Sequence, residues 1–211
     1  MKPFAYILLI FILPIFILLL SLNLHVYNEK FYLKEFEKNN VYDNIEKESV
    51  LENYKLLIGY FKNKNDLENS FFNEKEKLHM IDVKRLVNLS GKILYISLIL
   101  LVLLISYAIY KKDFDDLRSG LAIGNAITIM IIVLLILFVM FDFGSVFLNF
   151  HLGLFSNDLW QLNPATDKLI QMFPEEFFFD AFINILINSF IAIITVFSLL
   201  YILRIRTQVK K

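Results

Sequence analysis

The chain has 211 residues, of which 57% are hydrophobic, with a formal net charge of zero and no cysteine. Such a composition is far too apolar for a soluble domain of this size, so we predict an all-α integral membrane protein. The balanced charge gives no indication of a nucleic-acid partner. The lack of cysteine excludes disulfides, thiolate catalysis and cysteine-ligated metal ions.

The first apolar run extends from Phe4 to Leu22, inside a charge-free stretch between Lys2 and Glu29. It is long enough to cross a bilayer. A cleaved signal peptide is the alternative, but its apolar region would be too long and no A-x-A cleavage site follows it. We therefore predict a retained transmembrane helix over residues 1–27.

Residues 28–90 carry dense charge of both signs and predict a small helical extracytoplasmic subdomain. The sequence from Ser49 to Glu52 fits a capping box, and apolar residues follow it at helical spacing. Residues 63–66 are typical of a turn. A second helix is predicted to begin near Asn73, with Glu76 three positions later.

The second predicted helix of this subdomain contains the sequence HMIDVKRL, with His79 and Asp82. Residues three apart share a helix face, so the carboxylate could orient the imidazole. A surface histidine with a weak ion pair is the alternative interpretation. Its place just before an apolar run gives this histidine access to the membrane surface.

Three further apolar runs predict transmembrane helices over residues 93–110, 120–141 and 181–203, within a membrane domain spanning residues 91–211. Four spans put both termini on one side. Residues 111–118 and 204–211 are basic, which predicts cytoplasmic termini in a multi-pass plasma-membrane protein. The lysine-rich region 28–90 argues against this orientation, but a loop of about sixty residues translocates largely regardless of its charge.

The segment 143–180, between the third and fourth spans, is predicted to be the catalytic segment. Residues 143–155 are apolar and aromatic but contain two glycines, which favours an interfacial or re-entrant helix. Asn163 and Pro164 predict the start of a short helix that ends near Met172. Pro174 is then expected to open the fourth span.

Several polar or amphipathic side chains fall in this segment at membrane depth. Each has a structural explanation by itself, but together they predict a functional site, because lipid penalises polar groups. The chain lacks H-E-x-x-H, G-x-S-x-G and a glycine-rich phosphate loop, and its histidine spacing is not diagnostic of a metal. General acid–base chemistry such as acyl transfer suits the set. The candidates are His151, Asn157, Asp158, Trp160, Asp167 and Glu175.

The sequences FHLGLFSNDLWQLNPATDKLIQMFPEEFF and HMIDVKRL resemble the lipoprotein intramolecular transacylase (Lit) family of Gram-positive bacteria. Asn163 departs from the aspartate expected in the family's L-D-P sequence. The resemblance implies transfer of the sn-2 acyl chain of a diacylglyceryl lipoprotein to the α-amino group of its N-terminal cysteine. It implies that no metal ion or cofactor is needed. The implied partners are the lipoprotein substrate and membrane lipid.

The resemblance also implies that His151 and His79 are the catalytic pair. Which one is the base and which the acid or nucleophile is not determined by the sequence. Our hypothesis is that His151 meets the ester at the outer leaflet, while His79, oriented by Asp82, serves the amine. A non-catalytic membrane scaffold or receptor component and a metal-dependent membrane hydrolase are the alternative functions.

Overall fold

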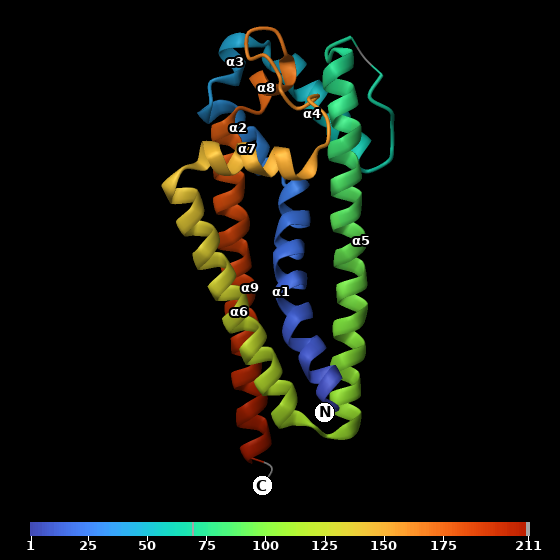
Figure 1. The fold of residues 1–211 in the computed structure, drawn as a ribbon, viewed down its shortest axis with the longest axis vertical. Helices are drawn as coiled ribbons and strands as arrows, with labels where there is room; N and C mark the ends of the chain where they lie inside the picture. Colours follow the sequence, from blue (N-terminus) through green and yellow to red (C-terminus); the bar gives the residue numbers. More distant parts are fainter. Residues whose placement is uncertain (69, 210–211) are drawn as a thin grey trace. The chain divides into compact units, whose positions relative to one another are not determined.

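The computed structural model describes the backbone of residues 1–68 and 70–209, and side chains up to residue 198 together with Tyr201 (Figure 1). Throughout this part of the chain the regular structure is helical. Four helices are long and apolar enough to cross a membrane: α1, α5, α6 and α9. The predicted all-α membrane architecture with four spans is therefore confirmed. The helices are α1 (Pro3–Val26), α2 (Glu29–Lys38), α3 (Val41–Asn44), α4 (Lys47–Phe61), α5 (Glu74–Lys111), α6 (Phe114–Phe141), α7 (Phe143–Leu154), α8 (Lys168–Met172) and α9 (Glu175–Val209).

The chain divides into two compact units. The membrane unit comprises residues 1–23, 91–137 and 183 onward, and the site unit comprises residues 24–90 and 138–182. The segment 138–182 therefore belongs to the same unit as the polar region 28–90, although the second and third spans lie between them in sequence.

In the membrane unit, α6 packs against α1 through two glycines four residues apart. A Cβ added to Gly124 would lie 3.1 Å from the carbonyl oxygen of Ile10 and 3.0 Å from Leu13 Cδ2. A Cβ on Gly120 would lie 2.9 Å from Leu9 Cδ2. Small residues at this spacing let two membrane helices approach closely, so that van der Waals packing can hold them together.

The helices that contain the predicted spans are longer than the spans themselves. Residues 93–110 form only the second part of α5, which starts at Glu74 and has 38 residues without a break. Helix α6 starts at Phe114, before the predicted span 120–141, and α9 starts at Glu175, directly after Pro174 as predicted and before the apolar run 181–203. The apolar runs mark where a helix can contact lipid, whereas its backbone hydrogen bonds continue through the polar flanks. Ser49 does not open a helix, because α4 begins at Lys47.

The site unit has an aromatic core that joins segments distant in sequence. Phe36 on α2 lies 5.7 Å, centroid to centroid, from Phe173, and Phe31 lies 5.3 Å from Phe177 near the start of α9. Edge-to-face and tilted pairs of this kind contribute about 0.5–1.5 kcal/mol each beyond the burial of their surface. The polar region 28–90 therefore shares one core with residues 169–177.

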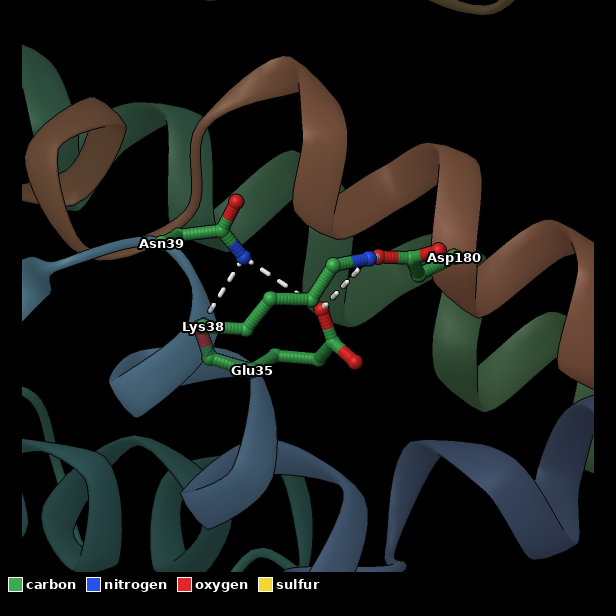
Figure 2. A network of polar contacts seen from close by, with 4 residues as sticks. All are labelled: Glu35, Lys38, Asn39 and Asp180. Carbon is green, nitrogen blue, oxygen red and sulfur yellow. Dashed lines mark hydrogen bonds and ion pairs between the residues drawn. The ribbon is translucent and has the colours of Figure 1, made fainter.

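A polar network reinforces the joint between α2 and the first turns of α9 (Figure 2). Glu35 is buried, and its Oε2 accepts a hydrogen bond of 3.3 Å from Asn39 Nδ2. Lys38 pairs with Asp180, and its Nζ lies 4.0 Å from Glu35 Oε2. Burial raises the pKa of Glu35, and its hydrogen bond to Asp180 adds to the effect. Buried charged groups persist when they are paired in this way.

Candidate active site

His79 lies in the second turn of α5, where a capping box fixes the start of the helix. Asn73 Oδ1 accepts a hydrogen bond from the Glu76 backbone N–H, and Glu76 Oε2 accepts one from the Asn73 N–H. The helix was predicted to start here, and it does. Glu76, His79 and Met80 point inward on one face, and His79 is only 6% exposed.

His151 lies in the third turn of α7 and is 9% exposed. Asp142 caps the start of α7 by accepting a hydrogen bond of 3.0 Å from the Ser145 N–H. The Nδ1 atom of His151 is 2.7 Å from the carbonyl oxygen of Phe147, one turn earlier. A carbonyl oxygen can only accept, so Nδ1 carries the proton and Nε2 keeps a lone pair in the neutral ring.

The two imidazoles lie side by side, with ring centroids 6.3 Å apart. Aromatic rings surround them: Phe147 and Trp160 lie 4.3 and 5.0 Å from the His151 centroid. Phe155 contacts both rings, at 5.1 Å from His79 and 5.6 Å from His151. The pair therefore occupies an apolar environment that both histidines share.

This environment keeps both rings neutral. Burial and, to a smaller extent, the neighbouring His151 lower the pKa of His79 to about 4, although the charge of Asp82 opposes the change. Burial also lowers the pKa of His151, partly offset by its hydrogen bond to Phe147. Both imidazoles are therefore neutral near pH 7 and each has one nitrogen with a lone pair, but the lower pKa makes His79 a weak base.

The family model described as lipoprotein intramolecular transacylase Lit matches residues 7–178, a range that includes both histidines. The chain belongs to the lipoprotein intramolecular transacylase (Lit) family. It is thus a membrane-integral acyltransferase whose substrate is a lipoprotein, which confirms the predicted family and activity. Among curated protein sequences, none matches the chain significantly.

Solved structures of Lit from Bacillus cereus are similar to this transacylase over nearly its whole length. One, determined in meso, has a TM-score of 0.85 with 26% identity, covering 98% of this chain and 97% of that chain. A form with a histidine-to-arginine substitution has a TM-score of 0.81 at 25% identity, covering 99% and 94%. A histidine-to-alanine form has a TM-score of 0.80 at 25% identity, covering 98% and 94%.

The lowered pKa values of the transacylase can be measured directly. In a ¹⁵N-histidine NMR titration of the His25→Phe variant, which leaves two rings, we expect the His79 ring to stay neutral down to about pH 4. Replacing His151 with phenylalanine should raise the pKa of His79, because the repulsion between two imidazolium ions is then removed. A His79 signal that titrates near pH 6.5 would contradict the buried geometry.

Asp82 and Asn157 link the two histidine-bearing segments of the transacylase. Asn157 Nδ2 donates a hydrogen bond of 2.9 Å to Asp82 Oδ2, and Arg85 Nη1 donates one of 2.9 Å to Oδ1. Asp82 was predicted to orient His79. Its oxygens instead hold the loop after α7 and a neighbouring arginine, so its effect on His79 is through its charge.

The remaining predicted residues have different surroundings. Trp160 is in the aromatic shell of His151, whereas Asp158 is exposed and accepts from Gln161 Nε2 at 3.2 Å. Asp167 is buried and bonded to the α5 start, and Glu175 is exposed at the first residue of α9. Across the described residues, no three histidine or carboxylate side chains are grouped to hold a metal ion.

The sequence analysis did not identify Phe147, whose backbone carbonyl oxygen fixes the tautomer of His151. The signal was available, because a residue four positions earlier lies one turn away on a helix.

The expected helix start at Asn163 is wrong: α8 begins at Lys168. Asn163 Oδ1 accepts from the Ala165 N–H at 3.0 Å, which makes an Asx turn in place of a helix. The predicted helix end at Met172 and the opening of α9 after Pro174 agree with the structure.

Proposed function

We propose that this transacylase moves the sn-2 acyl chain of a diacylglyceryl lipoprotein to the α-amino group of the lipoprotein's N-terminal cysteine, with His151 and His79 as the catalytic pair. The observation that carries the proposal is the 6.3 Å separation of two buried imidazoles. General acid–base catalysis needs a group that can take up a proton near pH 7 and lies within reach of it. One imidazole can take up the proton of the amine that gains the acyl chain, and the other can donate a hydrogen bond to the oxygen that loses it.

In the reaction, the amine nitrogen bonds to the ester carbonyl carbon, and the bond from that carbon to the glycerol oxygen breaks. The lone pair on His151 Nε2 takes the proton of the amine, and the resulting imidazolium returns a proton to the glycerol oxygen. His79 donates a hydrogen bond to that departing oxygen. Both rings end neutral, and no cofactor takes part. This scheme gives the amine to His151, where the sequence-based hypothesis gave it to His79; the bond from Nδ1–H to Phe147 leaves the lone pair of His151 on Nε2.

The surrounding side chains have supporting roles in this scheme. Trp160 and Phe155 exclude water from the imidazoles, and Asp82 and Asn157 hold the loop after α7 on α5. Donor and acceptor belong to one lipoprotein molecule, so correct positioning supplies much of the acceleration. For Asp158 and Glu175, which are exposed, a contact with the lipoprotein remains a prediction.

The proposed site faces the outer leaflet, and both termini are cytoplasmic. The lysine and arginine residues within 111–118 and the basic C-terminal residues support this orientation through the positive-inside rule, which counts Lys and Arg near the ends of the spans. Connections alternate between the two sides of a membrane. Residues 28–90 follow the first span and residues 143–180 follow the third, so the two segments, which carry the two histidine motifs, share the side opposite to the termini.

Tandem mass spectrometry of a lipoprotein N-terminal peptide, from cells with and without this protein, tests the function. Because the acyl chain only changes position, the intact mass should stay constant while fragmentation moves one acyl chain from the glyceryl group to the cysteine nitrogen. Loss of an acyl chain would instead indicate a hydrolase. An unchanged fragmentation pattern would leave a scaffold as the explanation.

A further inference from the structure

Glu76 is a buried carboxylate that the proposed chemistry does not use. It is 1% exposed, and its two oxygens serve two different helices. Oε2 completes the capping box of α5 by accepting from the Asn73 N–H at 2.7 Å, whereas Oε1 accepts from the Leu169 N–H, in the first turn of α8, at 2.5 Å. A capping box within α5 would need only the first of these bonds.

Helix α8 depends on this second bond because its own N-cap residue is engaged elsewhere. Asp167 occupies the N-cap position but makes no side-chain bond to its own helix. Its Oδ2 accepts from the Asn163 N–H at 2.8 Å, and its Oδ1 accepts from Asn73 Nδ2 at 3.0 Å. Each helix start is therefore bonded to an acidic residue of the other, which satisfies polar groups that burial would otherwise penalise.

This joint lies one helical turn before His79 on the inward face of α5. The Asp82–Asn157 hydrogen bond, at 2.9 Å, lies about one turn after His79. Two polar links thus bracket His79, and both connect α5 to the segment that continues from α7, which carries His151. These two links hold α5 to that segment on both sides of His79 along the helix.

We propose that Glu76 is a positioning residue for the transacylation, which holds His79 at working distance from His151 by capping α5 and α8 together. This inference rests on the proposed function for its kinetic consequence, but not for its geometric one. A displacement of about 1 Å in a catalytic group can cost roughly a hundredfold in rate.

The geometric test uses the absence of native cysteine. The full chain carrying both His79→Cys and His151→Cys is placed in lipid vesicles and treated with dibromobimane. This reagent becomes fluorescent when it joins two nearby thiols. We expect Glu76→Ala to reduce cross-linking at least fivefold, with Glu76→Gln intermediate because an amide oxygen keeps one of the two accepted bonds. As a control, the variant with His79→Cys and Val83→Cys has both thiols within α5. It should cross-link to the same extent whether residue 76 is glutamate, alanine or glutamine.

The kinetic test uses purified lipoprotein and the native histidines. We expect Glu76→Ala to lower kcat about ten- to a hundredfold with little change in KM, and Glu76→Gln to recover part of it. Glu74→Ala is the matched control, because Glu74 is in the same turn but exposed, with a salt bridge of 2.9 Å to Lys77; it should change neither readout.

If Glu76→Ala lowers thermal stability while cross-linking and kcat stay at the wild-type level, Glu76 is only structural and the proposal is overturned. Should Glu76→Ala not fold, Glu76→Gln decides by the same two measurements. If His79→Ala remains active while cross-linking still depends on Glu76, the catalytic assignment is wrong but the joint stands.

Discussion

Replacing His151 or His79 with alanine is expected to lower the rate of acyl transfer by roughly 10²–10⁴-fold, the usual range for loss of a general acid–base group. The double variant should be little worse than either single one, because residues that act as a unit lose their function together. The readout is the fraction of lipoprotein N-termini that carry an acyl chain on nitrogen, measured by tandem mass spectrometry at equal protein levels.

The third histidine provides the matched control for this experiment. His25 is buried against Phe31, with ring centroids 4.1 Å apart, and neither of its ring nitrogens has a hydrogen-bond partner in the described part of the chain. His25→Phe keeps the ring shape and removes the unpaired polar atoms, so we expect full activity and unchanged or higher stability. Near-normal activity in both His151→Ala and His79→Ala would refute the catalytic assignment.

Replacing Gly124 with valine is expected to give the largest loss of stability. A Cβ at this position already lies 3.1 Å from a backbone oxygen of α1, which cannot move aside as a side chain can. The two methyl groups of valine therefore have to push α1 and α6 apart. Overpacking of this kind costs about 1–3 kcal/mol, which corresponds to a fall of roughly 5 °C in the midpoint of thermal unfolding. Circular dichroism in detergent measures this midpoint.

Substitutions at two other glycines distinguish the effect of helix packing on stability from the effect of helix propensity. Gly153 is also helical, but nothing lies within 4 Å of its added Cβ, so Gly153→Val should leave the midpoint unchanged or raise it. Gly120→Ala should have a small effect, because its close neighbour is the end of the flexible Leu9 side chain. Equal midpoints for Gly124→Val and Gly153→Val would show that the α1–α6 contact does not limit stability.

The four spans were predictable from the sequence because a lipid bilayer imposes a length and a composition on any helix that crosses it. The start of α5 near Asn73 was predictable because capping is a local interaction between residues three apart. The same local logic failed at Ser49 and Asn163. Helix α4 begins before Ser49, at Lys47, and α8 begins after Asn163, at Lys168, where Glu76 from a distant helix accepts a hydrogen bond from the Leu169 N–H.

By itself, the sequence determined the membrane class, the helical content and, through two motifs, the family and the two histidines that are candidates for catalysis. Only the tertiary structure brought the rings of His79 and His151 to 6.3 Å, selected the His151 tautomer and gave the second oxygen of Glu76 to another helix. The physical reason is that periodicity and capping report which face of a helix is apolar and where the helix begins. Which distant segment packs on that face depends on the whole chain.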